Sequence, residues 1–317
     1  MTLNADQTHT TVLFLEVLNF QKVKSGGRYI DATVGSGGHS AEICKIGGEV
    51  LGLDQDPISL DFARKYLENA CPGIFPILVN SNFSKIQAVA ESHGFSSVDG
   101  ILMDLGFASF QMDEPTRGLS FSNDGPLDMR LDPNLGVTAA DLVNSLPEKE
   151  LEHLFREFGD EPKAHVLARK IVEGRKLKPF TSTRDLASLV EQTNLTKWSN
   201  DGTKSRHIGS QIRYKTHLHP ATRIFMALRI AVNSELENLK IALPQAFELL
   251  KPGGRLLIIS FHSGEDRIVK NAFRDWEREK KGKILTKKPV VPTEAEIYEN
   301  PRARSAKLRV LEKMTNK

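Results

Sequence analysis

The chain has 317 residues, of which 39% are hydrophobic, and its 43 Lys and Arg against 40 Asp and Glu leave a formal net charge of +3. This length is enough for a substantial core in one large or two modest domains. Three features argue against a membrane-spanning or disulfide-rich secreted protein: no apolar run would cross a bilayer, the first residues lack a signal-peptide pattern, and only two cysteines are present. We therefore expect a cytoplasmic protein.

Residues 29–56 show the pattern around which the rest of the chain is arranged. Their sequence, YIDATVGSGGHSAEICKIGGEVLGLDQD, predicts a strand over 29–31, a glycine turn, a helix over 40–46 and a second strand over 50–53 that ends at Asp54. Glycines let the backbone approach a ligand closely, and a carboxylate at the tip of the second strand accepts hydrogen bonds from ribose hydroxyls. This succession is typical of a doubly wound α/β sheet that holds a ribose-bearing cofactor.

The alternation of strands and helices continues to Asp104. The spacing of apolar residues predicts a helix around 60–67, a strand over 74–79, a helix over 86–93 and a strand over 98–103. Asp104 ends the last of these strands, at the edge where open α/β sheets bind ligands.

The alternation then breaks, and the residues from Met112 to about Thr216 predict a different kind of structure. The stretch 114–136 is rich in Pro, Gly, Asp and Asn and predicts an ordered loop, whereas 198–215 is polar, basic and expected to be flexible. Between them the sequence predicts short helices over 139–146, 147–158, 162–176 and 183–192. We interpret 112–216 as a helical, substrate-binding domain inserted into a sheet domain that is formed by 1–111 and 217–317.

The sheet resumes after the insertion. A long helix is predicted to start at Pro220, and a second helical segment follows it, with Pro244 as a break or a first-turn residue. The KPGG sequence of 251–254 predicts a tight turn ahead of an apolar strand over 255–261. The alternation of 305–311 predicts a last strand.

Basic residues are concentrated in two blocks. Residues 168–229 hold 13 Lys and Arg against 4 Asp and Glu, and residues 267–317 hold 15 against 7, while the remainder of the chain is acidic. Two basic blocks on an otherwise acidic protein predict a polyanionic partner such as nucleic acid. Charge alone supports solvated helix faces equally well.

Three kinds of cofactor site share a glycine turn after a strand. A dinucleotide site has Gly-x-Gly-x-x-Gly, which Gly35, Gly37 and Gly38 do not match, and a phosphate loop ends in Gly-Lys-Ser/Thr, which is absent. Sites for S-adenosylmethionine share the succession of strand, glycine turn and helix. This cofactor has no pyrophosphate, so its sites do not need the glycine patterns that bind one. Because Asp54 lies where a ribose-binding acid is expected, the pattern favours an S-adenosylmethionine-dependent methyltransferase.

Longer motifs extend this interpretation over nearly the whole chain. The matching segments are HTTVLFLE (9–16), DATVGSGGHS (31–40), DGILMDLG (99–106), RGLSFSNDGPLDMRLDP (117–133), HPATRIFMALRIAVNSEL (219–236), KPGGRLLIISFHSGEDRIVK (251–270) and NPRARSAKLRV (300–310). On these segments the sequence resembles the bacterial 16S ribosomal RNA cytosine-N4 methyltransferases. The resemblance implies a class I methyltransferase core with a Rossmann-like sheet, an inserted α-helical domain, and methylation of N4 of a cytosine in the decoding centre (P site) of 16S rRNA.

The resemblance also implies a set of site residues and a partner. The family's cofactor contacts fall on Gly37, Gly38, His39, Asp54, Phe83, Asp104 and Gln111. The residue pattern supports the glycines and Asp54 independently, whereas Phe83 taken alone predicts a core phenylalanine and His39 a histidine at a helix start. The implied partner is 16S rRNA or the small ribosomal subunit, and the oligomeric state, monomer or homodimer, stays open.

Two departures from the family's pattern lie on the expected substrate side. Where the family usually has Gly-Val-Ser-Ser-Pro-Gln after Asp104, this chain has Gly-Phe-Ala-Ser-Phe-Gln, and Gly264 replaces the usual leucine of FHSLEDR. Phe107 and Phe110 are therefore candidates to stack on an extruded cytosine, with core packing as the simpler assignment.

Methyl transfer to an exocyclic amine requires alignment of donor and acceptor and the removal of one proton. Asp104 lies where many amino methyltransferases carry an Asp-Pro-Pro-Tyr-like motif, so it is a candidate to orient the amine, and contact with the cofactor alone is the alternative. His262, at the end of the resumed strand, is a second catalytic candidate, with a structural hydrogen bond as its alternative.

Charged side chains outside the sheet are candidates for contact with the substrate. Asp128 and Arg130 lie in the inserted loop, where Arg130 is expected to pair with a carboxylate or a phosphate. Arg302 and Arg304 are candidates to hold backbone phosphates.

Other functions were weighed against this one. They are a class I methyltransferase that acts on another nucleic acid or on protein, and a non-catalytic RNA-binding assembly factor, which the loss of Asp54 or of the glycines would have favoured. A dehydrogenase is the least supported, because the dinucleotide fingerprint is incomplete. The pair His217 and His219 has a spacing found in metal sites, but no third ligand is evident, and we expect no metal.

Overall fold

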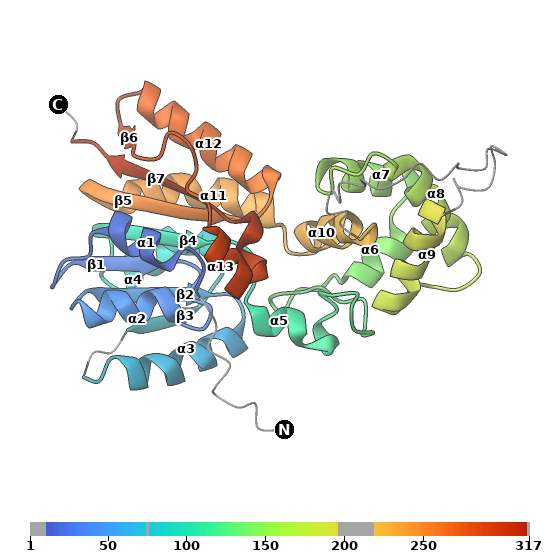
Figure 1. The fold of residues 1–317 in the computed structure, drawn as a ribbon, viewed down its shortest axis with the longest axis horizontal. Coiled ribbons are helices and arrows are strands. Elements are labelled where there is room, and N and C mark those ends of the chain that lie inside the picture. Colours follow the sequence, from blue (N-terminus) through green and yellow to red (C-terminus); the bar gives the residue numbers. More distant parts are fainter. Residues whose placement is uncertain (1–10, 74–75, 196–218, 316–317) are drawn as a thin grey trace. The chain divides into compact units, whose positions relative to one another are not determined.

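The computed structural model describes residues 11–73, 76–195 and 219–315, and the chain divides into two compact units (Figure 1). The first, called the sheet unit below, consists of Met1–Ser109 and Glu235–Lys317, and the second, called the helical unit, is Phe110–Ser234. The sequence places the insertion at 112–216, so the two divisions differ mainly at its C-terminal end.

Among the described residues, seven strands form one sheet in the order β3-β2-β1-β4-β5-β7-β6. Their bounds are β1 Arg28–Asp31, β2 Glu49–Asp54, β3 Ile77–Asn80, β4 Val98–Asp104, β5 Leu250–Ser260, β6 Gly282–Ile284 and β7 Lys307–Lys313. Strands β1 to β5 are parallel to their neighbours within that group, β7 is antiparallel to β5, and β6 is antiparallel to β7. The strand order reverses beside β1, as in a doubly wound sheet, so the predicted fold class is confirmed.

Helices cover both faces of this sheet (Figure 1). Their bounds are α1 Phe14–Gln21, α2 Gly38–Lys45, α3 Pro57–Ala70, α4 Ile86–Ser92, α11 Glu235–Leu249, α12 Ser263–Arg278 and α13 Glu294–Glu299, with 3-10 turns η1 Phe83–Lys85 and η4 Pro301–Ser305. Successive strand residues point to opposite faces: Ile30 packs in the core that includes α4, α11 and α12, and Tyr29 packs with α2 and α3. The central strands are therefore buried on both sides, which explains their nearly continuous apolar sequence.

Pro244 does not break the helix that follows the insertion, and this expectation from the sequence is wrong. α11 continues through Pro244 from Glu235 to Leu249. Proline removes one backbone donor and crowds the preceding turn, but buried side chains on both sides of it, including Leu239 and Phe247, pack the helix into the core. The burial of this apolar face outweighs the local cost of the proline.

The KPGG segment forms an irregularity at the start of β5. Val98 pairs with Leu250, and Gly100 pairs with Arg255, so the β5 residues between the two pairs loop outward. Gly253 lies in this loop with φ +79°. The segment predicted as a tight turn before the strand is therefore an irregularity within β5.

The two sequence segments of the sheet unit are closely interwoven. The backbone N–H of Leu13 donates a hydrogen bond of 2.7 Å to Oε1 of Glu296 in α13. In the sheet, β7 lies between β5 and β6, so one of the last segments of the chain fills an interior position.

The helical unit is built from short helices. Their bounds are α5 Ser109–Asp113, η2 Pro115–Arg117, α6 Ala139–Ser145, α7 Glu148–Glu157, α8 Ala164–Arg175, α9 Thr183–Leu195 and α10 Ala221–Val232. α10 packs against α6, α7 and α9, and its apolar stripe, which includes Ile224 and Leu228, is buried. These contacts place α10 in the helical unit, although the sequence assigned it to the sheet domain. The segment 198–215, expected to be flexible, lies outside the described residues. None of the helices in the described ranges is both long enough and apolar enough to cross a membrane.

Candidate active site

Three aspartates end neighbouring parallel strands at the carboxyl edge of the sheet. Asp31 ends β1, Asp54 ends β2 and Asp104 ends β4, and β1 lies between the other two strands. In an open α/β sheet, ligands bind at this edge, where the strand order reverses. All three aspartates belong to the sheet unit.

Asp54, the predicted ribose ligand, is held by the two turns beside it. Its Oδ2 accepts a hydrogen bond of 3.0 Å from the backbone N–H of Gly35, and its Oδ1 accepts one of 2.9 Å from the backbone N–H of Asp56. Burial raises the pKa of the Asp54 carboxyl to about 7, and the two hydrogen bonds oppose that rise. The carboxylate is therefore fixed in orientation, and each of its oxygens keeps a second lone pair for a ligand.

Asp31 is a further buried acid at this edge, and the sequence analysis did not single it out as a site residue. Its side chain accepts hydrogen bonds of 2.7 Å from Oγ of Ser40 and 3.3 Å from the backbone N–H of Thr33. Burial raises the pKa of Asp31 to about 6. The available signal was the spacing of Asp31 and Ser40 within DATVGSGGHS, which places a hydroxyl group of α2 beside the end of β1.

Among the described residues, the Asp104 carboxylate has fewer hydrogen bonds than those of Asp31 and Asp54. Its Oδ1 is buried without a hydrogen-bond partner among the described residues, and its Oδ2 lies 3.8 Å from Nε2 of His39. Burial raises the pKa of Asp104 well above its usual value, and the nearby charges of Asp31 and Glu265 raise it further. The backbone N–H of Asp104 donates a hydrogen bond of 2.6 Å to Oγ1 of Thr33, which fixes the end of β4 beside β1.

The electrostatic balance of this edge is negative. In the part of the chain that the structure describes, no Lys or Arg side chain pairs with Asp31, Asp54 or Asp104. Buried carboxylates in this arrangement disfavour one another's ionisation, and a cation placed among them would reverse the effect. The edge is therefore suited to a positively charged ligand that also carries hydroxyl groups.

The glycine turn between β1 and α2 has no space for side chains. Gly37 is the N-cap of α2 with φ +92°, and a Cβ on it would lie 3.2 Å from Cγ of Leu67. A Cβ on Gly38 would lie 2.1 Å from Oγ1 of Thr11. Glycine at both positions therefore keeps the backbone of the turn close to α3 and to the segment before α1.

The other predicted cofactor contacts lie in three different places. His39 is 5% exposed in the first turn of α2, where its ring stacks on Phe14 with the ring centres 6.3 Å apart. Phe83 begins η1 after β3 and packs, partly buried, against the core of the sheet unit. Gln111 is buried in α5 and belongs to the helical unit. The sheet unit thus brings His39 next to Asp104, and packing alone accounts for Phe83.

His262 is the N-cap residue of α12. Its Nδ1 accepts a hydrogen bond of 3.2 Å from the backbone N–H of Gly264, so the neutral ring carries its proton on Nε2, which lies 3.3 Å from Oε1 of Glu265. Oε2 of Glu265 accepts hydrogen bonds from the backbone N–H groups of Phe261 and His262, at 2.8 and 3.2 Å, and completes a capping box. The ring therefore makes the structural hydrogen bond that the sequence analysis weighed against catalysis.

Glu235, His262 and Glu265 bring three potential metal ligands within 4.8 Å of one another. The proton on Nε2 of His262 occupies the lone pair that a metal ion would need, and the N-terminal dipole of α12 disfavours a cation. Gly264, the departure from the family's leucine, lies beside the ring: a Cβ there would come within 3.1 Å of it. The glycine leaves the ring in contact with the backbone that it caps.

The remaining candidate substrate residues belong partly to the sheet unit and partly to the helical unit. Phe107 in the sheet unit and Phe110 in the helical unit are both half-buried. Gly106, which precedes Phe107, has φ +109°, a conformation that favours glycine. Arg302 and Arg304 are exposed on η4, in the sheet unit.

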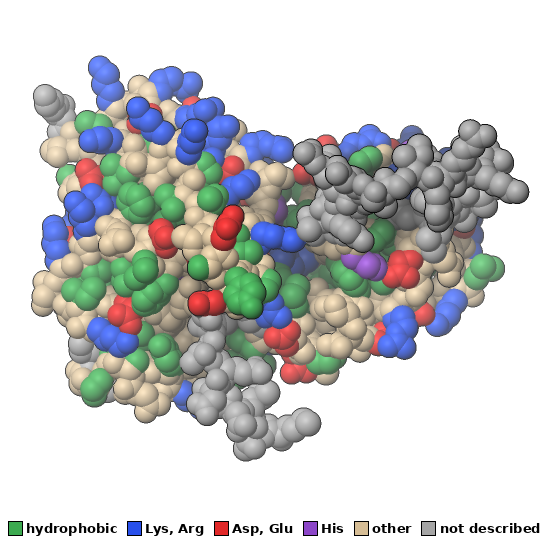
Figure 2. Space-filling model, viewed as in Figure 1, with side chains coloured by type: hydrophobic (Ala, Val, Ile, Leu, Met, Phe, Trp, Pro, Cys, Tyr) green, Lys and Arg blue, Asp and Glu red, His purple; other side chains and the backbone are tan. Residues whose placement is uncertain are grey.

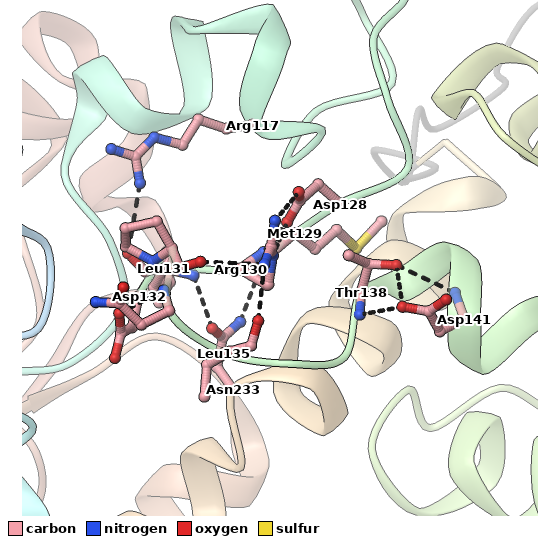
Figure 3. Close-up of polar contacts among 12 residues, drawn as sticks. Arg117, Asp128, Met129, Arg130, Leu131, Asp132, Leu135, Thr138, Asp141 and Asn233 are labelled. Carbon is pink, nitrogen blue, oxygen red and sulfur yellow. Dashed lines mark hydrogen bonds and ion pairs between the residues drawn. The ribbon is translucent and has the colours of Figure 1, made fainter.

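Arg130 pairs with a carboxylate, one of the two partners expected for it (Figure 3). Its Nε and Nη2 donate hydrogen bonds of 2.8 Å to the two carboxylate oxygens of Asp128, and its Nη1 donates to the backbone carbonyls of Pro133 and Leu135, at 3.1 and 2.7 Å. Asn233, at the end of α10, exchanges hydrogen bonds of 2.8 Å with the backbone of the two residues that flank Arg130. The guanidinium group is therefore used to shape this loop, and the Asn233 side chain ties the loop to the end of α10.

His219 makes contacts within the helical unit. Its Nε2 lies 2.7 Å from Oε1 of Glu191, and its ring stacks on Phe121 with the ring centres 4.5 Å apart. His217, the other member of the pair, lies outside the described residues. These contacts are those of a packed, hydrogen-bonded histidine.

Comparison with known proteins finds relatives over nearly the whole chain. A family model described as the MraW methylase family matches residues 6–314. Ribosomal RNA small subunit methyltransferase H of Carboxydothermus hydrogenoformans is 46% identical over 324 aligned residues, which cover 97% of this chain and 98% of that protein. Proteins of the same name from Thermomicrobium roseum and Coprothermobacter proteolyticus are 43% and 42% identical, over 98% and 96% of this chain and 94% and 96% of their own lengths.

Proposed function

The chain belongs to the MraW methylase family, and on this premise we propose that it transfers a methyl group from S-adenosylmethionine to N4 of a cytosine in the decoding centre of 16S rRNA. The observation that carries the proposal is the cluster of Asp31, Asp54 and Asp104, three buried carboxylates without a Lys or Arg partner in the described ranges. S-adenosylmethionine supplies an electrophilic methyl group on a sulfonium, together with an ammonium group and a ribose, and these are the groups that such a site would bind.

The residues at the carboxyl edge fit this cofactor. Asp54 would accept hydrogen bonds from ribose hydroxyls, because each of its oxygens keeps a free lone pair. The unpaired Oδ1 of Asp104 would face a cationic group. Gly37 and Gly38, which fix the turn against α3 and the segment before α1, enter the proposal as cofactor contacts on the family resemblance. His39, Phe83 and Gln111 enter the proposal on the family resemblance.

Asp104 is the proposed catalytic residue. The exocyclic amine of cytosine is a weak nucleophile, because its lone pair is delocalised into the ring. An ionised carboxylate beside the amino hydrogens would orient the amine and accept the proton that methylation releases. His262 is assigned the positioning of the start of α12.

The proposed contacts with RNA follow the same reasoning. Phe107 and Phe110 would stack on the extruded cytosine, and Arg302 and Arg304 would contact phosphates. Asp128 and Arg130, which are engaged with each other, would shape the inserted loop. The partner in this proposal is 16S rRNA in the cytoplasm, as naked RNA or in the small ribosomal subunit.

Labelled S-adenosylmethionine and mass mapping test the proposed function. We expect transfer of label to 16S rRNA or to small ribosomal subunits, and the loss of one N4-methylated cytosine from the decoding centre of cells that lack the protein. Transfer only to DNA or protein would contradict the proposal, as would a folded protein that takes up no S-adenosylmethionine in calorimetry.

The substitution Asp104→Asn tests the catalytic assignment. It should lower turnover at saturating cofactor by about 100-fold or more, the usual contribution of a positioned acid–base group. Cofactor affinity is measured separately by calorimetry. Asp99→Asn is the matched control, since Asp99 lies at the start of the same strand and pairs with Lys251 at the opposite edge. Unchanged turnover of Asp104→Asn at saturating cofactor would remove Asp104 from catalysis.

A further inference from the structure

Cations form a stripe along one face of α12. Arg267, Lys270, Arg274 and Arg278 follow one another at spacings of three or four residues, so they lie on the same side of the helix. Lys270 is half-buried and the other three are exposed, while the opposite side of the helix, which includes Phe273, is buried in the core. Over these residues the stripe is about 16 Å long, at 1.5 Å per helical residue.

The segment after α12 continues this positive surface. β6 packs against α12 and carries the exposed Lys283, and Lys287 and Lys288 are exposed in the loop that follows. Lys280 and Lys281 are exposed in the turn between helix and strand. Figure 2 shows Lys and Arg side chains gathered over the region of α12 and β6. We call these residues the α12 basic surface: Arg267, Lys270, Arg274, Arg278, Lys280, Lys281, Lys283, Lys287 and Lys288.

In the described ranges, the acidic residues of the same segment neutralise two cations of this surface, Arg278 and Lys281, and the others have partners elsewhere. Glu265 caps the start of α12, and Asp266 pairs with Arg309 of β7, with its carboxylate 2.6 Å from Nε. The other acids of the segment are Asp275, which pairs with Arg278, Glu277, which accepts the backbone N–H of Ile284, and Glu279, which pairs with Lys281.

Several cations of the surface are left without a counter-charge. In the described part of the chain, these have neither an ion pair nor a side-chain hydrogen bond: Arg267, Lys270, Arg274, Lys283, Lys287 and Lys288. A solvated helix face usually mixes both signs in neighbouring positions, whereas the stretch from Arg267 to Arg274 carries no Asp or Glu.

The composition of the surface indicates the kind of partner. None of the large apolar side chains that are exposed in the described ranges lies within 263–288. A protein interface has an apolar core, whereas a surface of unpaired Lys and Arg matches a row of phosphates. The helix beneath is held firmly, because Trp276 stacks on Phe247 of α11 with the ring centres 4.3 Å apart.

The surface starts at the edge of the sheet where the carboxylates lie. Asp104 pairs with Ile259 in the sheet, β5 ends at Ser260, and α12 begins at Ser263. Arg267 is thus about one helical turn from that edge, and the stripe leads away from it along α12.

We propose that the α12 basic surface binds the sugar–phosphate backbone of ribosomal RNA next to the target nucleotide. This inference rests on the proposed function, in that rRNA is the substrate, and it adds a docking surface within the sheet unit itself, apart from the inserted helical unit. Contacts of this kind depend on salt and little on base sequence, so they would strengthen binding and set its register without choosing the base.

Charge reversal tests the surface. The variant carries Arg267→Glu, Lys270→Glu and Arg274→Glu. Its matched control carries Lys22→Glu, Lys24→Glu and Lys65→Glu, which changes the net charge equally at exposed positions of the sheet unit outside the surface. The probes are a 16S rRNA transcript and small ribosomal subunits, titrated at several salt concentrations, and S-adenosylmethionine affinity by calorimetry reports on the fold. A second variant with glutamine at the same three positions separates lost attraction from added repulsion.

We expect the α12 variant to bind the transcript at least tenfold more weakly than the control, with normal cofactor affinity. The slope of log K against log salt should fall by about 2, the contribution of three phosphate contacts. The glutamine variant should show the same slope with a smaller loss of affinity.

Two results would overturn the proposal. One is an equal loss of affinity in the variant and its control, which would show a general effect of net charge. The other is a loss of binding to subunits with unchanged binding to the transcript, which would point to an acidic protein. Failure of the proposed function would be seen separately, as the absence of methyl transfer to rRNA by the unmodified protein.

Discussion

Asp31 and Asp54 at the carboxyl edge of the sheet each accept hydrogen bonds that stabilise the local fold, and each also contributes negative charge to the candidate cofactor site. Asp54 accepts hydrogen bonds from the turn after β1 and from the start of α3, so the acid that would read the ribose also fixes the glycine turn next to it. Asp31 ties the end of β1 to Ser40 of α2 in the same way. A charge change at either residue therefore alters both the local fold and the field that a cofactor meets.

These carboxyls predict the pH dependence of cofactor binding. Burial raises the pKa of Asp31 to about 6 and that of Asp54 to about 7, so the ligand-free protein holds protons there that a cationic ligand must displace. Because the folded pKa values are raised, the stabilising effect of these acids in the empty protein is present at low pH and is lost as the pH rises through 6 and 7. S-adenosylmethionine affinity should accordingly increase between about pH 5.5 and pH 8 and then level off.

Calorimetry checks this prediction. Titrations in two buffers of different ionisation enthalpy should detect protons released on binding near pH 6.5, about midway between the two pKa values. Asp54→Asn should bind more weakly and show a smaller pH dependence, whereas Asp99→Asn should behave as the unmodified protein. An affinity that is constant over this range would rule out the carboxyls as the groups that meet the cationic ligand.

At this scale the sequence predicted part of the site. Asp54 and the glycines were found from a local pattern of strand, turn and strand. Asp31 was missed because only the fold shows that its carboxyl group is buried and that no Lys or Arg side chain of the described residues pairs with it. The N-cap role of His262 depends on a hydrogen bond to Gly264, which periodicity does not reveal.

At the scale of elements, one substitution in α11 is expected to stabilise the protein. Pro244 lies within the helix and its side chain is exposed, so Pro244→Ala removes no core packing and restores one backbone hydrogen bond. Alanine is favoured over proline in a helix interior by about 3 kcal/mol, and the greater freedom of the unfolded chain offsets up to about 1 kcal/mol of this. We expect the free energy of unfolding to increase by about 2–3 kcal/mol.

Urea unfolding measures this change, with Lys240→Ala, at another exposed position of α11, as the control. The control should shift the midpoint little, because Lys240 makes only a surface ion pair. A destabilised Pro244→Ala protein would mean that α11 needs the proline for its shape.

The elements that the sequence predicted well are those with long apolar patterns, such as β2, β4 and the strand part of β5. The three-residue β6 was not predicted, because it is too short to show alternation and gains its place by pairing with β7. α10 was assigned to the sheet domain, whereas its contacts group it with the helical unit. Its apolar stripe predicts burial but does not say against which partner, and only its contacts with α6, α7 and α9 decide this.

At the scale of the whole molecule, the division into two units predicts separable unfolding. Arg130→Gln would leave the partly buried Asp128 without its partner and two loop carbonyls without a donor, all within the helical unit. The expected cost is on the order of 2 kcal/mol, confined to that unit. S-adenosylmethionine affinity, which depends on the carboxylates of the sheet unit, should stay within a factor of about 3.

Scanning calorimetry with and without cofactor resolves the two effects. The ligand should raise the transition temperature of the sheet unit, and Arg130→Gln should lower the transition temperature of the helical unit. Arg169→Gln, in an exposed position on α8 with its nearest carboxylate 3.9 Å away, is the control. If Arg130→Gln abolished cofactor binding, Arg130 would have to be counted as part of the cofactor site.

The position of β7 between β5 and β6 has a consequence for how this protein is made. Translation proceeds from the N-terminus, so the contiguous residues of the helical unit have all been synthesised before β5, β6 and β7, and they lie far ahead of β7 along the chain. The sheet, and the hydrogen bond from Leu13 to Glu296, must wait for the final segment. We expect stalled nascent chains that end before β7 to protect the helical unit from protease while the first four strands remain open to cleavage.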